Sequence, residues 1–206
     1  MQELILVRHG EADHLVDGSG GGWVDTRLTE LGRSQSHQVG YRIKENVRGR
    51  RVKLYSSDLS RAYETASIIG EMINAEPVKA QALRGLSLGV AGEMKKAEAD
   101  LIKNPLTLPL FDWIPYQGSE SLGMMQERIN HFMDSVSREE EETMIIVAHG
   151  NSSVAILYWW LGINRELLTR ISKPSFHLDP CSFTHVYRNE LGKMTLSKLN
   201  DSDHLD

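Results

Sequence analysis

The sequence has little cysteine and no surplus of positive charge, and each shortage excludes a class of protein. Cys181 is the single cysteine among 206 residues, so an internal disulfide is impossible and no cysteine cluster is there to hold zinc. We therefore expect a reducing compartment, the cytoplasm. Lysine and arginine number 23 against 28 aspartate and glutamate residues, a net charge of −5, so we expect no nucleic-acid partner.

Long apolar runs are also lacking. The first apolar stretch, residues 4–7, is short and follows an acidic start, unlike a signal peptide. No run approaches the roughly 18 residues of a membrane helix, so we expect no membrane partner. Hydrophobic residues at 40% and charged residues at 25% are ordinary for a chain that buries a core, and the length predicts a single domain, residues 1–206. No heptad pattern or apolar stripe indicates an oligomeric state.

Short apolar stretches alternate with segments of helical periodicity. Strands are predicted at 3–8, 53–57, 77–79 and 144–148, and two antiparallel strands at 181–188 and 193–199. Helices are predicted at 29–46 with Thr29 as its cap, at 59–73 capped by Ser57 or Asp58, at 119–142 and at 150–161. This alternation favours an α/β fold with a mostly parallel sheet and helices on both faces.

Two segments do not show a regular pattern. Residues 10–23 contain five glycines, four of them within 18–22, and are predicted to be a loop. Residues 82–118 contain three prolines and are predicted to form an irregular excursion, a lid that sets specificity over a site. Its aromatic stretch, residues 111–116, either lines a substrate pocket or packs against other side chains of the protein.

Charged and polar residues follow three of the predicted strands. His9 and Gly10 come after Arg8, Arg61 lies in the first turn after the second strand, and His149 follows the strand at 144–148. Ligands in such sheets bind beyond the carboxyl ends of the strands. The topology can therefore bring two arginines and two histidines to one edge.

This set of residue types suits the transfer of a phosphoryl group. Two guanidinium forks bind a tetrahedral dianion, and a neutral histidine is a competent nucleophile. A second histidine could hydrogen-bond the oxygens in the transition state, and the Gly10 carbonyl could fix the tautomer of His9. Each residue taken alone also has a plain structural interpretation, such as a surface ion pair for Arg61.

Several motifs then occur in an order that covers nearly the whole chain. They are LVRHGE at 6–11, WVD at 23–25 with LTELG at 28–32, YSSDLSRAYETA at 55–66, GSES at 118–121, VAHG at 147–150 and the closing residues 200–205. In these motifs the chain resembles the histidine phosphatase superfamily, in its phosphoglycerate mutase-like branch.

The resemblance implies a fold, a site and a chemistry. The fold would be a three-layer α/β/α sandwich. His9 would be the nucleophile that becomes phosphorylated, and Arg8, Arg61 and His149 would complete the phosphate pocket, with no metal or organic cofactor. The partners would be a small phosphorylated substrate and inorganic phosphate as the product.

The chain departs from the family pattern in three ways. Gly85 occupies the position of the usual general acid, a glutamate, and a glycine cannot donate a proton. Glu93 is a candidate substitute, and Glu11, Asp13 and Asp58 are candidates with less support. Leu15 stands where the family often has a phosphate-binding asparagine, a contact that His14 could supply. The chain is also short for a mutase of the family.

Three hypotheses remain from the sequence. The first is a phosphomonoesterase that acts through phosphorylated His9. The second is a phosphoglycerate mutase-type phosphotransferase that shares the first half-reaction. The third is a phosphate-binding regulatory protein in which Gly85 has weakened catalysis.

Overall fold

A six-stranded sheet organises the chain in the computed structural model, which describes residues 1–138, 143–170 and 176–205. The strands lie in the order β3-β2-β4-β1-β5-β6. Their bounds are Glu3–Arg8 (β1), Val52–Ser56 (β2), Val78–Lys79 (β3), Thr143–Ala148 (β4), Phe183–Arg188 (β5) and Met194–Asp201 (β6). The first four in this order are parallel, whereas β5 and β6 are antiparallel to their neighbours.

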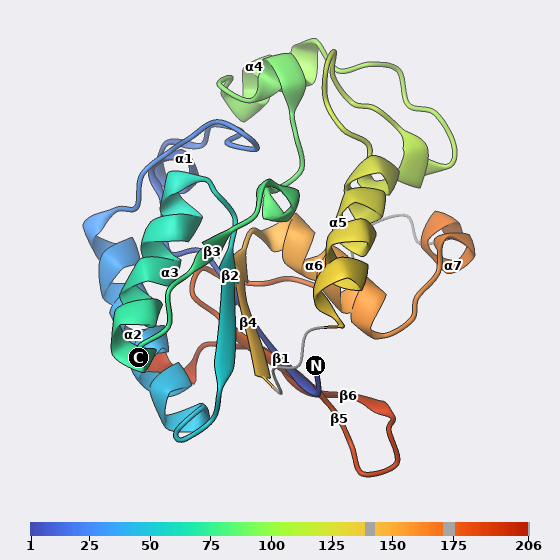
Figure 1. Cartoon of the computed structure of the whole chain (residues 1–206). Helices are drawn as coiled ribbons and strands as arrows, with labels where there is room; N and C mark the ends of the chain where they lie inside the picture. The colour runs from blue at the N-terminus through green and yellow to red at the C-terminus, as the bar shows by residue number, and fades with distance from the viewer. Residues whose placement is uncertain (139–142, 171–175, 206) are drawn as a thin grey trace.

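Helices cover both faces of this sheet (Figure 1). Two helices, α2 (Glu30–Asn46) and α3 (Ser60–Ile73), pack on one face, and α5 (Leu122–Val136) and α6 (Gly150–Trp160) pack on the other. The described residues also form three short α-helices, α1 (Asp13–Asp17), α4 (Lys96–Leu101) and α7 (Arg165–Arg170), and four single-turn 3-10 helices. The predicted three-layer α/β/α sandwich with a mostly parallel sheet is confirmed.

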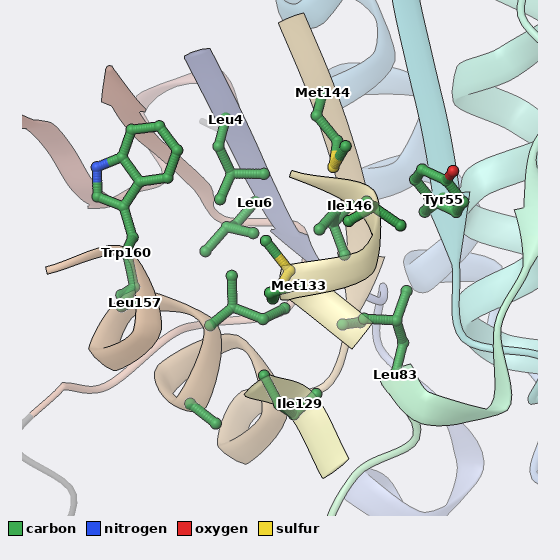
Figure 2. Close-up of a cluster of buried hydrophobic side chains, with 14 of the residues drawn as sticks. Leu4, Leu6, Tyr55, Leu83, Ile129, Met133, Met144, Ile146, Leu157 and Trp160 are labelled. Carbon is green, nitrogen blue, oxygen red and sulfur yellow. The ribbon is translucent and has the colours of Figure 1, made fainter. Parts of the chain in front are cut away.

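Alternating side chains of the central strands form the two halves of the core, because successive residues of a strand point to opposite faces. Leu6 and Ile146 pack toward Met133 of α5 and Leu157 of α6 (Figure 2). Ile5, Val7, Ile145 and Val147 pack toward α2 and α3. Burying each such side chain stabilises the fold by about 1.5–3 kcal/mol. This rigid base fixes the position of the residues that follow β1 and β4.

The helix starts show where the sequence was informative and where it was not. The predicted cap of α2 is confirmed, because the Thr29 hydroxyl accepts from Gly32 N at 3.0 Å. The predicted caps of α3, Ser57 or Asp58, were wrong. Leu59 is the capping residue, and Asp25, distant in sequence, accepts from Ser60 N at 2.7 Å.

Other differences lie in segments of weak local signal. The predicted loop at 10–23 contains α1, a helix too short to show periodicity, which ends at Gly18 in the left-handed conformation. Helix α5 begins after Ser121 and ends at Val136, and the end of its predicted range, 139–142, lies outside the described residues. Helix α7 was not predicted. Of the helices that the structure describes, none has the length and apolar character needed to cross a membrane.

Candidate active site

A pocket of about 310 Å³ lies at the carboxyl ends of β1 and β4. It brings together five of the predicted residues, since Arg8, His9, His14, Arg61 and His149 all line it. Within the part of the chain that the structure describes, no group of three histidine, cysteine or acidic side chains is placed to hold a metal ion.

The His9 ring is buried, and one of its nitrogens is fixed. His9 is 2% exposed, and its Nδ1 lies 2.7 Å from the Gly10 carbonyl oxygen. A carbonyl only accepts, so Nδ1 bears the proton and Nε2 keeps its lone pair. Gly10 is required here by a close approach, because a Cβ atom at this position would lie 2.4 Å from the Gly32 oxygen.

His149 lies against His9, with ring centroids 4.9 Å apart in an edge-to-face arrangement. Its Nε2 lies 2.9 Å from the hydroxyl oxygen of Ser57, which follows β2. Both side chains are buried, so this hydrogen bond fixes the orientation of the His149 ring. Ser57 was expected only as a possible cap of α3, although its place at the end of a predicted strand was a usable signal.

Backbone carbonyls hold the two guanidinium groups of the pocket. Arg61 donates to the Val24 and Gly22 oxygens, each at 2.8 Å, and Arg8 donates to the Leu178 oxygen at 2.6 Å. The Nε atoms of both arginines are buried and have no hydrogen-bond partner among the described residues. Two unpaired N–H donors in a pocket that His9 also lines make a site for an anion.

The arginines and the burial keep the histidines neutral. Burial, together with the charges of Arg61 and Arg8, lowers the pKa of His9 well below its ordinary value. Burial also lowers the pKa of His149, with a smaller contribution from His9. Burial lowers the pKa of Arg61 itself to about 10, so it stays charged at neutral pH. The pocket is thus cationic around an uncharged His9.

His14 lies in the pocket beside His9. The two ring centroids are 5.6 Å apart, and His14 Nδ1 lies 2.9 Å from the Thr26 hydroxyl. Burial lowers the pKa of His14 to about 4, with smaller contributions from Arg61 and Arg8. The ring is covered by Gly21, whose φ of +69° and lack of a side chain permit this contact.

Position 85 also faces the pocket. A Cβ atom on Gly85 would meet Cβ of His149 at 3.3 Å, so a side chain there would point toward the second histidine. Trp23 Nε1 and Arg128 Nη2 donate to the Gly85 carbonyl at 2.8 and 3.2 Å, which fixes this segment. The sequence alignment of Gly85 with the slot of the general acid therefore agrees with its position in space.

The structure does not bring the substitute acids to the pocket. Glu93 is exposed and does not line it, and neither do Glu11, Asp13 or Asp58. Asp58 is instead paired with Arg84 by two hydrogen bonds of 2.7 and 2.8 Å. Among the described residues, the pocket is lined by no carboxylate at all.

The excursion at 82–118 reaches the pocket only through its first residues. Gly85, Leu86 and Leu88 line the cavity. The aromatic stretch packs instead: Phe111 lies in a cluster with Val154 and Leu168 and does not itself line the pocket. Of the two alternatives for residues 111–116, packing is correct.

Arg128 and Glu120 close the base of this excursion. Arg128 donates to the Ala82 oxygen at 2.5 Å and to both carboxylate oxygens of Glu120, at 3.0 and 2.8 Å. Glu120 in turn pairs with Ser87: its backbone N donates to the Ser87 oxygen, and its carboxylate accepts from Ser87 N, each at 3.0 Å. Both ends of the segment between Ser87 and Glu120 are therefore held at one place.

A match to a family model shows the family to which the chain belongs. The model of the histidine phosphatase superfamily, branch 1, matches residues 4–202. The chain belongs to this superfamily. The predicted resemblance is confirmed, and the arrangement of arginines and histidines described above is the pocket of a histidine phosphatase superfamily member.

Relatives of this superfamily member include proteins with phosphatase and mutase names. Phosphoserine phosphatase 1 of Hydrogenobacter thermophilus is 30% identical, over 100% of this chain and 95% of the relative. Phosphoglycerate mutase-like protein 4 of Arabidopsis thaliana is 31% identical, over 99% of this chain and 87% of the relative. A mycobacterial glucosyl-3-phosphoglycerate phosphatase solved with vanadate superposes with a TM-score of 0.81 at 23% identity, covering 98% of this chain and 100% of that chain, which shows a shared fold.

Proposed function

We propose that the protein is a phosphomonoesterase that hydrolyses a small phosphorylated metabolite through a phosphohistidine on His9. The observation that supports this most is the pair of buried, unpaired Nε–H donors of Arg8 and Arg61 beside a neutral His9. A phosphate group between them would receive the hydrogen bonds that these donors lack. The family membership and the phosphatase-named relatives support the same function.

The reaction has two steps. In the first, His9 Nε2 attacks phosphorus and the ester oxygen leaves, while Arg8 and Arg61 stabilise the charge of the equatorial oxygens. We assign to His149 and His14 further hydrogen bonds to the phosphoryl group, and to Gly10 the carbonyl that holds the His9 tautomer. In the second step water attacks phosphorus, and inorganic phosphate and free His9 are released.

Residues other than the arginines and histidines of the pocket select the substrate. We infer that the excursion at 82–118 governs this choice, because Leu86 and Leu88 enter the cavity beside the phosphate site. Glu93 has no place in the proposed set, since it lies exposed outside the lining. We expect the protein to work in the cytoplasm, on the basis of its single cysteine.

The test is covalent labelling. The native chain is mixed with a ³²P-labelled phosphomonoester and quenched in base, in which phosphohistidine survives and an acyl phosphate does not. We expect label on the native chain and on His131→Ala, which removes an exposed histidine of α5, and no label on His9→Ala. Label retained by His9→Ala would refute the mechanism.

Two other functions are separated by the products. Isomerisation of a phosphoglycerate without release of phosphate would indicate the mutase-type activity that the name of the Arabidopsis relative suggests. Tight binding of phosphate or vanadate without turnover would indicate a regulatory protein, which Gly85 in the acid slot favours.

A further inference from the structure

We propose that the preferred substrate is a phosphate ester of an acidic aromatic hydroxyl, a phenol above all, rather than of an alkyl alcohol. This inference rests on the proposed phosphomonoesterase function and names the class of its leaving group. Three features of the pocket support it: the lack of a carboxylic acid among its described lining residues, the neutral state of its buried histidines, and its apolar walls.

The first feature is the missing acid. An alkyl alcohol leaves as an alkoxide unless a proton is supplied, and a general acid typically contributes about 10²–10⁴-fold to such a step. Position 85 faces His149 but has no side chain, and no carboxylate is found among the described residues that line the cavity. A phenol needs no such help, because its conjugate base is stable in water.

The second feature is that the buried histidines do not replace the acid. His14 and His149 are 8% and 5% exposed, and Arg8 and Arg61 lie in the same cavity, so protonating either ring would add a positive charge beside two others. The burial of both rings disfavours this charge further, which is why their pKa values are lowered. His177 at the rim is exposed and is paired with Asp179 at 3.0 Å.

The third feature is the chemistry of the walls. The side chains beyond the arginines and histidines are mainly apolar: Leu15, Leu86, Leu88, Val154, Phe176 and Leu178. The polar ones are the neutral Ser19 and Asn151. An aromatic ring can pack against leucine and phenylalanine side chains. The ammonium group of an amino acid ester would find no carboxylate among the described lining residues.

The chemical step balances without a donor. The lone pair of His9 Nε2 forms the P–N bond, the P–O bond breaks, and the aryl oxygen leaves with the electron pair as a phenolate. Water then attacks phosphorus, the P–N bond breaks, and its electron pair returns to Nε2. Both protons of that water stay on the product as dihydrogen phosphate, which exchanges a proton with the phenolate in solvent.

The test compares leaving groups. kcat/KM is measured for a graded series of substituted phenyl phosphates and for two alkyl esters, 3-phosphoglycerate and O-phosphoserine. This constant reports the transfer to His9 even when the second step limits turnover. We expect kcat/KM to fall steeply as the leaving-group pKa rises, and the alkyl esters to react at least 10²-fold more slowly than phenyl phosphate.

Two variants of one position serve as the matched pair. Gly85→Ala and Gly85→Glu add the same Cβ atom beside His149, but only glutamate adds an acid. We expect Gly85→Glu to raise kcat/KM for the alkyl esters relative to the aryl esters, and Gly85→Ala to leave that ratio as in the native chain. If Gly85→Glu does not fold, as judged by circular dichroism, the leaving-group series on the native chain decides alone.

The outcomes separate this inference from the function on which it rests. Equal kcat/KM for alkyl and aryl esters, with phosphorylated His9, would overturn the aryl preference and leave the phosphatase mechanism standing. Binding of phosphate without turnover of any ester would overturn both.

Discussion

Removing the Ser57 hydroxyl tests how far catalysis depends on the orientation of His149. Ser57 is fully buried, and its Oγ lies 2.9 Å from His149 Nε2. Ser57→Ala deletes this hydrogen bond and leaves a buried ring nitrogen without its partner. A typical intramolecular hydrogen bond contributes about 0.5–1.5 kcal/mol, and an unsatisfied buried group costs about 1–3 kcal/mol.

These magnitudes convert into measurable changes. We expect Ser57→Ala to lower kcat/KM for phenyl phosphate about 2–12-fold, which corresponds to about 0.5–1.5 kcal/mol of transition-state stabilisation. We expect the free energy of unfolding in urea to fall by about 1–3 kcal/mol. The drop in kcat/KM should exceed any change in the affinity for inorganic phosphate, because the ring orientation matters most when charge shifts during transfer.

The matched control is Ser153→Ala on α6. Ser153 is also fully buried, but its hydroxyl has no hydrogen-bond partner among the described residues and does not line the pocket. Its removal should leave kcat/KM unchanged and stability equal or higher. The reasoning is refuted if Ser57→Ala and Ser153→Ala give the same kcat/KM as the native chain.

Three further predictions follow from the same contacts. Arg61→Lys keeps the charge but loses the guanidinium fork, so kcat/KM should fall about 10–150-fold, the equivalent of one charge-assisted hydrogen bond; a loss under threefold in steady-state assays would contradict this. Thr29→Ala should destabilise the fold by about 1 kcal/mol in urea, whereas Thr29→Ser should not. Because the folded pKa values of His9, His14 and His149 are depressed, the unfolded chain binds protons that the folded chain does not, so stability is full above the ordinary histidine pKa and is lost as the pH falls. Between pH 6.5 and 5.5, urea unfolding should show a loss of about 1 kcal/mol for each such histidine, and a flat profile would show that these rings titrate in the folded chain as they do in the unfolded chain.

The strands and the arginines and histidines of the pocket could be predicted because their signals are local. Buried apolar runs such as residues 3–8 and 144–148 are short and continuous, and a helix that begins at a threonine cap shows its start. Arg8 ends such a strand, His9 and His149 follow such strands directly, and Arg61 lies in the first turn after another. The topology rule alone therefore brings all four to one edge.

The rest depends on contacts between residues distant in sequence. Asp25 caps α3 from 35 residues away, and Ser57 meets His149 across 92 residues, so neither contact has a local signature. Glu93 was a candidate on sequence proximity alone, and it lies exposed because the chain turns between position 85 and position 93. Five residues of α1 cover less than two turns, too few to show a period.

Ser87, Glu120 and Arg128 join the two ends of the excursion by hydrogen bonds. The segment between Ser87 and Glu120 can therefore be exchanged as one unit. Its two ends meet at one backbone pair, so a replacement of another length can join there without moving β1, β4, His9 or His149. Doubling the length of a flexible loop between fixed ends costs only about 0.6 kcal/mol. Loops grafted at Ser87 and Glu120 should therefore redirect the enzyme to new leaving groups while its phosphate chemistry stays the same.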